Sequence, residues 1–137
     1  MHVPVVRVGV VGAALVASVA MTGCTVSRLD RLHRQSERVQ SHLQSEQAKT
    51  LALSEGDPKR AAKLNHLTDL RLQLSAVNIG LGTTRLIPDD KREIAYDVVQ
   101  EAYDTIEWNI PLAPGERPRP MPAQFQGGML RFDSLIP

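Results

Sequence analysis

The feature that most constrains the fold is the helical pattern of residues 89–110. At about 100° per residue, the apolar and small side chains of this segment cover about 200° of a helix surface without a charge. An ordinary surface helix has an apolar stripe only about 100° wide. This helix must therefore pack against at least two neighbours, which predicts a helical bundle. The arc consists of Ile94, Ala95, Tyr96, Val98, Val99, Ala102, Tyr103, Thr105, Ile106, Asn109 and Ile110.

The opposite face of the same helix is acidic. Its carboxylates are Glu93, Asp97, Glu101, Asp104 and Glu107. Trp108 projects from this acidic side at helical spacing. Asp90 and Glu93 have the spacing of a capping box, which predicts a helix start near residue 89. Pro111 ends the helix, because proline has no amide hydrogen to continue it.

Residues 28–54 are predicted to form a first helix with a narrower, roughly heptad-like stripe. The stripe consists of Leu29, Leu32, Val39, Leu43 and Thr50, with Ser36 and Gln47 filling its gaps. Such a helix has one good neighbour, so it is expected to serve as a stalk or as a strand of a coiled coil. Gly56 is expected to stop it in a left-handed conformation.

Residues 58–81 are predicted to form the second helix, with Asp57 as N-cap and Pro58 as first helical residue. Its main stripe is the most regular in the chain and consists of Leu67, Leu70, Leu74, Val77 and Leu81. Leu72 and Ile79 form a second strip, which predicts a second neighbour and a central place in the bundle. The glycines expected to end the helix are Gly80 and Gly82.

The C-terminal part is not helical. Residues 111–122 are rich in proline and favour extended polyproline II structure. Residues 123–137 are too apolar for a solvated tail and are expected to dock on the bundle or on another protein, with Gly127-Gly128 as a turn. The predicted fold class is all-α: a small three-helix bundle, or a helical hairpin plus an N-terminal stalk helix, with an irregular Pro-rich C-terminal tail. Residues 28–110 would form the helical domain and 111–137 the tail.

The N-terminal segment has the parts of a secretory signal. A basic residue, Arg7, precedes an apolar run over residues 8–20, and small residues follow at Thr22 and Gly23. The run is shorter than the roughly 20 residues that a membrane-spanning helix needs. Residues 1–23 are therefore predicted to be a signal peptide that is removed.

The sequence Met21-Thr22-Gly23-Cys24 resembles the lipobox of bacterial lipoproteins. The resemblance implies cleavage before Cys24 and attachment of diacylglycerol to its thiol, with residues 24–27 as the lipidated anchor. An uncleaved anchor and an ordinary signal followed by a chance cysteine are the alternatives.

The resemblance also implies a location. Several acyl chains on Cys24 would hold the protein durably on a membrane. Thr25 follows the cysteine, which in Gram-negative lipoproteins resembles the default export to the outer membrane, facing the periplasm. Cys24 is the chain's single cysteine, so no disulfide is expected. Basic residues number 16 and acidic ones 15, and this near-neutral balance argues against nucleic acid as a partner.

No constellation in the sequence favours catalysis or metal binding. Histidines with helical carboxylate neighbours are His33 with Glu37, His42 with Glu46, and His66 with Asp69. A metal site needs three or four convergent ligands, which these pairs do not supply. There is neither a nucleophile turn nor a phosphate-binding glycine loop. We therefore predict no enzyme, no catalytic residue, no metal, no cofactor and no small-molecule substrate.

Two features favour binding of other proteins. The first helix carries a row of arginines, Arg28, Arg31, Arg34 and Arg38, that is expected to pair with the acidic helix or to touch anionic head groups. Trp108 lies next to the proline segment, which either folds back over the ring or leaves it as an anchor for a partner.

The sequence thus predicts a lipid-anchored, non-enzymatic envelope protein that binds other envelope proteins or itself. The candidate partner-binding residues are Val98, Ala102, Ile106 and Trp108. One alternative is a phage- or plasmid-type accessory lipoprotein, such as an outer-membrane spanin in lysis. Another is a pilotin-like secretion chaperone, which would capture a partner helix at the apolar arc around Ala102.

Overall fold

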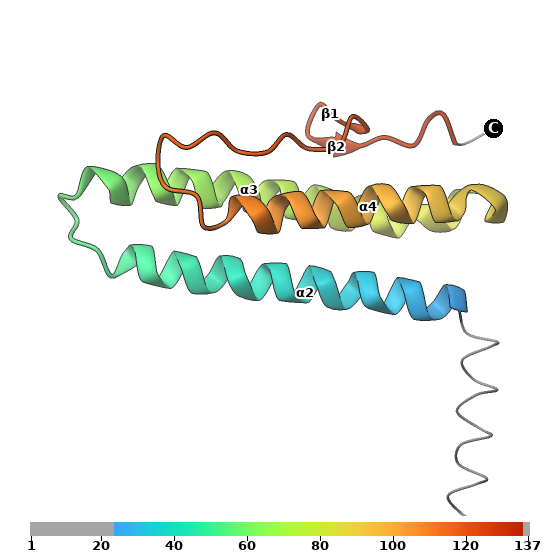
Figure 1. Ribbon diagram of the computed structural model, residues 1–137, viewed down its shortest axis with the longest axis horizontal. Helices are drawn as coiled ribbons and strands as arrows, with labels where there is room; N and C mark the ends of the chain where they lie inside the picture. Colours follow the sequence, from blue (N-terminus) through green and yellow to red (C-terminus); the bar gives the residue numbers. More distant parts are fainter. Residues whose placement is uncertain (1–23, 136–137) are drawn as a thin grey trace, which may run out of the picture. The chain divides into compact units, whose positions relative to one another are not determined.

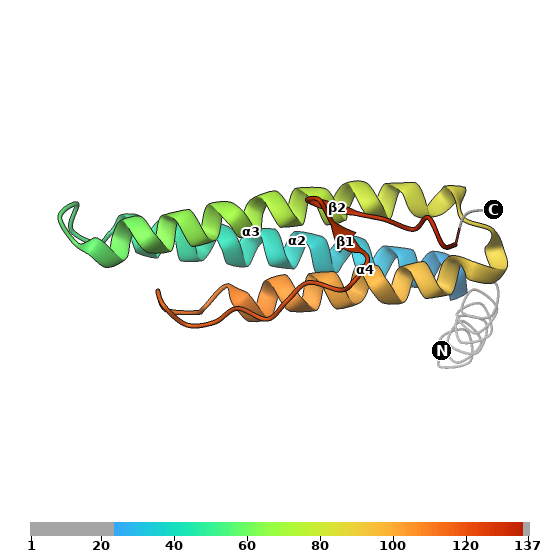
Figure 2. The ribbon, with the colours of Figure 1, turned by 90° about the horizontal axis from the view of Figure 1, so that it is seen from above.

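The structure is a computed structural model that describes residues 24–135. Within these residues the elements are α2 (Cys24–Leu51), α3 (Pro58–Thr83), a 3-10 turn η1 (Thr84–Leu86), α4 (Asp89–Asn109), β1 (Phe125–Gln126) and β2 (Met129–Leu130). The chain divides into two units between Arg31 and Leu32, and the bundle belongs to the second unit. In that unit α3 runs antiparallel to α2 and to α4 (Figures 1 and 2). The all-α fold class and the three predicted helices are confirmed.

Helix α2 contributes its predicted stripe to the core. Leu32, Val39 and Leu43 are buried, and so is Thr50, whose hydroxyl donates to the Glu46 carbonyl at 2.7 Å. From Leu32 onward α2 is therefore a member of the bundle, so the prediction of a separate stalk is wrong for this part. The predicted anchor segment 24–27 is the first turn of the same helix.

The end of α2 differs from the prediction. The helix stops at Leu51, and the turn that follows is closed by the amide of Asp57, which donates to the Ser54 carbonyl at 3.0 Å. Gly56 lies within this turn but has no positive φ. The expected left-handed glycine stop is thus wrong, because the chain turns by successive backbone hydrogen bonds instead.

The start of α3 is as predicted. Asp57 is the N-cap and accepts a hydrogen bond from the Lys59 amide at 2.9 Å, and Pro58 is the first helical residue. The whole predicted main stripe, Leu67, Leu70, Leu74, Val77 and Leu81, is buried. The helix continues to Thr83, so Gly80 and Gly82 lie inside it and do not end it.

Helix α4 begins at Asp89, with Pro88 as N-cap and no side-chain cap. The predicted capping box of Asp90 and Glu93 is therefore wrong. Asp89 instead pairs with Arg92 at 2.7 Å, and Arg92 also donates to the Ile87 carbonyl at 3.0 Å, which fixes the connection between α3 and α4. Every member of the predicted apolar arc is buried except Ile94, which is exposed.

A polar cluster joins all three helices at the edge of the core, where two buried hydroxyls meet the exposed side chain of Asn78. The hydroxyls of Ser36 on α2 and Tyr103 on α4 both donate to Oδ1 of Asn78 on α3, each at 2.7 Å. Tyr103 is fully buried, and this burial raises the pKa of its hydroxyl to about 12. Because these two hydrogen bonds join one residue of each helix, they fix how far the three helices are shifted along one another.

The tail returns along α3 and α4 on the side away from α2 (Figure 1). Its two short strands form a hairpin, with Phe125 opposite Leu130 and Gln126 opposite Met129. The predicted glycine turn is confirmed: Gly127 and Gly128 have φ of 60° and 75°, which suits a two-residue type I′ turn.

The hairpin docks on the protein's own bundle. Leu130 and Phe132 are buried. Gly80 faces Leu130 so closely that a β-carbon on Gly80 would lie 2.9 Å from Cβ of Leu130. The missing side chain of Gly80 thus makes room for Leu130 of the tail. Of the two docking places expected for the tail, its own bundle or another protein, the structure has the first.

Candidate functional site

The best candidate for a functional site lies where α4 ends and the tail begins. Trp108 is in the last turn of α4 and is 54% exposed. The guanidinium carbon of Arg119 lies 3.5 Å from the centre of the indole ring, so the two side chains form a cation–π pair. Trp108 projects from the acidic side of α4 as predicted, and the tail folds back over it.

Asn109 holds the same tail residue by its backbone. Its Oδ1 accepts from the Arg119 amide at 2.8 Å, and its Nδ2 donates to the Arg119 carbonyl at 3.0 Å. The Asn109 side chain is buried. We call Trp108, Asn109 and Arg119 the tail clasp. The role of Asn109 was not predicted from the sequence, although an amide in a largely apolar arc indicates a polar partner.

The end of α4 is fastened to α3 as well. Lys63 Nζ donates to the carbonyls of Ile110 and Leu112, both at 2.6 Å, and Nε2 of His66 lies 2.6 Å from the Asn109 carbonyl. A cation suits the free carbonyls at a helix C-terminus. Burial lowers the pKa of Lys63, and the nearby carboxylates, Glu46 first, partly offset this. These hydrogen bonds hold the end of α4, and with it the tail clasp, against α3.

An open pocket of about 400 Å³ lies beside the indole ring. Its lining residues are Asp104, Glu107, Trp108, Pro111 and Leu112. Both carboxylates have contacts to α2: Asp104 Oδ1 accepts from Gln35 at 2.5 Å, and Glu107 Oε1 lies 3.7 Å from Arg38 Nε. The predicted pairing of the basic helix with the acidic helix is therefore present at Arg38. We call this the Trp108 pocket.

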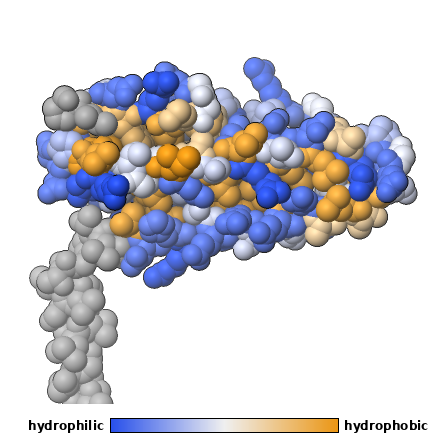
Figure 3. All heavy atoms as spheres, turned by 180° about the vertical axis from the view of Figure 1, so that it is seen from behind, coloured by the Kyte–Doolittle hydropathy of each residue, from blue (hydrophilic) through white to orange (hydrophobic). Residues whose placement is uncertain are grey.

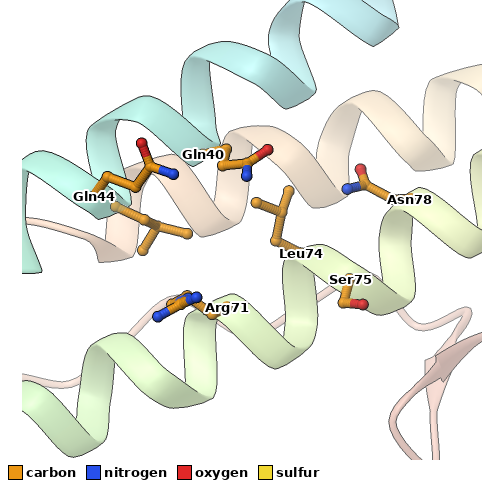
Figure 4. A pocket seen from close by; sticks show the side chains of 7 residues that line it. Gln40, Gln44, Arg71, Leu74, Ser75 and Asn78 are labelled. Atoms are coloured by element: carbon orange, nitrogen blue, oxygen red, sulfur yellow. The ribbon is translucent and has the colours of Figure 1, made fainter.

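A second, more polar groove of about 220 Å³ lies between α2 and α3 (Figure 4). Gln40 and Gln44 line it from α2, and Arg71 and Ser75 from α3, over a floor that includes Leu74. Arg71 donates to Gln47 Oε1 at 3.0 Å, so its guanidinium already bridges the two helices. The polar lining of the groove is thus part of the contact between α2 and α3.

Three of the four predicted partner-binding residues lie in the core. Val98 is 7% exposed, and Ala102 and Ile106 are fully buried. They pack within the bundle and do not form a surface groove, so this part of the prediction is corrected, and Trp108 alone of the four is exposed. Their apolar arc is wide because α4 has several intramolecular neighbours.

Helix α3 carries an exposed apolar strip that the prediction assigned to a second neighbour. Leu72 and Ile79 are 66% and 62% exposed, and Leu86 in η1 is 66% exposed. Figure 3, seen from the α3 side, shows apolar side chains in a row across this face. Among the described residues no element covers this strip, because the neighbours of α3 contact its other sides.

The remaining sequence predictions concern the anchor and metal binding. Cys24 begins α2, and the signal segment 1–23 lies outside the described residues. Within residues 24–135 no three His, Cys, Asp or Glu side chains are grouped to hold a metal ion. No helix in this same part of the chain has the length and hydropathy to span a membrane.

Comparison with known proteins adds no relative: no protein family, no curated protein and no solved structure matches the chain significantly.

Proposed function

We propose that the protein is a lipid-anchored, non-enzymatic subunit of the bacterial envelope that binds other envelope proteins. Cys24 would carry the lipid, and the bundle from Leu32 onward would present the binding surface. The proposed location is the outer membrane, with the protein facing the periplasm, as the resemblance of residues 21–25 to a lipoprotein signal implies.

The observation that carries the binding role is the exposure of Trp108 beside an open, largely apolar pocket. Exposed aromatic anchors next to hydrophobic pockets are enriched at protein interfaces. The buried hydroxyls of Ser36 and Tyr103, by contrast, are already engaged, because both donate to Asn78. The surface at Trp108 is thus a better candidate for binding a partner than the polar cluster is.

The secretion-chaperone alternative has less support. It required a groove at the apolar arc, and Ala102 and Ile106 are fully buried in the bundle. The lysis alternative predicts an inner-membrane partner and toxicity when the two are produced together, which co-expression would measure.

The proposal is tested by crosslinking and affinity capture from membranes, comparing the wild type with Cys24→Ala. Ser41→Ala is a matched control, because it changes an exposed α2 side chain of the same bundle. We expect the wild type and Ser41→Ala to fractionate with the membrane and to retain a defined partner, and Cys24→Ala to lose both. Membrane fractionation of full-length Cys24→Ala would contradict the anchor, and capture of no partner by the anchored wild type would contradict the binding role.

A further inference from the structure

A strip of α4 leads from the acidic face into the Trp108 pocket. Glu101, Asp104 and Trp108 follow one another at spacings of three and four residues, which places them on one side of the helix. All three side chains are exposed. Pro111 and Leu112 extend the strip with apolar wall beyond the indole. The surface therefore changes from anionic to apolar over two turns of helix.

The chain's own tail shows which chemistry the indole accepts. Arg119 lies between Pro118 and Pro120 and stacks on the ring at 3.5 Å. Arg119 is not among the residues that line the Trp108 pocket, so the pocket remains open beside the occupied ring. A basic side chain in an extended, proline-flanked segment is thus a ligand type that this ring already binds.

The open part of the strip selects for the same type of ligand. The carboxylates of Glu101 and Asp104 complement a cation, and the walls formed by Trp108 and Pro111 complement a proline ring. The pair between Glu107 and Arg38 is long, at 3.7 Å, and the Arg38 side chain is 65% exposed. Such an exposed pair is weak, so a ligand cation can replace Arg38 at Glu107.

The spacing on the helix fixes the spacing in the ligand. From Glu101 to Trp108 the helix rises by roughly 10 Å, at about 1.5 Å per residue. A polyproline II segment rises by about 3.1 Å per residue, so about three of its residues cover this distance. A ligand with proline in the pocket would place a basic residue over Glu101 about three positions away.

We propose that the Trp108 pocket and the adjoining carboxylates bind an extended, proline-rich segment of a partner protein with basic residues at about every third position. This proposal rests on the proposed function, since it names the partner chemistry of the same binding surface. The segment would lie along α4, with a proline against Trp108 and an arginine over Glu101.

The test uses the purified chain and a labelled synthetic peptide, (Arg-Pro-Pro)₃, with binding followed by fluorescence anisotropy. Trp108 is the chain's single tryptophan, so its intrinsic emission reports on this site alone. The comparison peptide carries Gln in place of Arg. The protein variants are Glu101→Gln and Asp104→Asn, and Glu55→Gln is the matched control, because it removes the same charge in the turn after α2.

We expect saturable binding with a change in Trp108 emission. Binding should be about two- to fivefold weaker for each strip variant, which loses one carboxylate, and weaker still for the Gln peptide, which loses all three cations. Glu55→Gln should bind as the wild type does. Asp104→Asn keeps the oxygen that accepts from Gln35, and helicity measured by circular dichroism checks its fold. Absence of saturable binding, equal binding of the Gln peptide, or equal weakening by Glu55→Gln would overturn the proposal.

A measurement of self-association distinguishes a partner peptide from a second copy of the chain as the occupant of the Trp108 pocket. A dimer that forms through the same pocket and is not displaced by the peptide would also overturn the proposal, since the occupant would be a second copy. Failure of the peptide with intact, Cys24-dependent partner capture would reject this ligand and leave the proposed function standing. Loss of capture itself would reject the proposed function, whatever the peptide does.

Discussion

The docking of the tail makes a sharp prediction for two neighbouring glycines of α3. Alanine at Gly82 meets no atom within 4 Å, whereas alanine at Gly80 would lie 2.8 and 2.9 Å from Cδ1 and Cβ of Leu130. In a helix, Gly→Ala is worth up to about 1 kcal/mol. The free energy of unfolding should therefore rise by up to about 1 kcal/mol in Gly82→Ala.

At Gly80 the same gain is opposed by overpacking, which typically costs about 1–3 kcal/mol. Because Cβ of Leu130 is fixed to the backbone, the tail itself has to move to make room. We expect Gly80→Ala to lower the free energy of unfolding by about 1 kcal/mol, so that the two variants differ by about 2 kcal/mol.

The assay is urea unfolding followed by far-ultraviolet circular dichroism, together with the rate of tryptic cleavage after Arg131, which should increase only in Gly80→Ala. Leu130→Gly supplies the control background: it removes the clashing atoms, so adding Gly80→Ala to it should become stabilising. If Gly80→Ala stabilises the wild type as much as Gly82→Ala does, the described contact between α3 and the tail is refuted.

Four further outcomes follow from the polar contacts and the exposed strip. Asn109→Ala should lower the free energy of unfolding by about 2 kcal/mol, as two hydrogen bonds to the Arg119 backbone are lost, and should change Trp108 emission; an unchanged urea midpoint would contradict this. Asn78→Ala should cost about 2–3 kcal/mol in urea unfolding, since it leaves the buried Tyr103 hydroxyl without its acceptor, and more than Tyr103→Phe does. Stability should fall as the pH rises from about 10 to about 12, because the unfolded state releases the tyrosine proton first, and this fall should be smaller in Tyr103→Phe. Ile79→Gln should change the free energy of unfolding by no more than about 0.5 kcal/mol; a larger loss would mean that its face is covered.

The helices were predictable because their signals are local. The stripes of α3 and α4 follow from residues three and four positions apart, and the Asp57 cap depends on the next two residues. The turn at Gly127 and Gly128 is equally local, because few other residues adopt positive φ at two successive positions. These predictions needed no knowledge of which segment packs on which.

The misassigned residues are those whose role depends on a distant segment. Gly80 has the sequence appearance of a helix stop, but its lack of a side chain accommodates Leu130, fifty residues further on. The amide of Asn109 indicated a polar partner, but that this partner is the backbone of Arg119 could not be predicted from the sequence. Ala102 was expected to line an open groove because a helical wheel shows the width of the apolar arc of α4 but not which segments cover it.

Lipid attachment at Cys24 is tested most directly by mass spectrometry of the N-terminal peptide of the protein isolated from membranes. We expect the mature chain to begin at Cys24 and this residue to carry a diacylglycerol thioether, which raises the mass of the N-terminal peptide accordingly. An unmodified Cys24 thiol, or a peptide in which residues 1–23 are still attached, would contradict it.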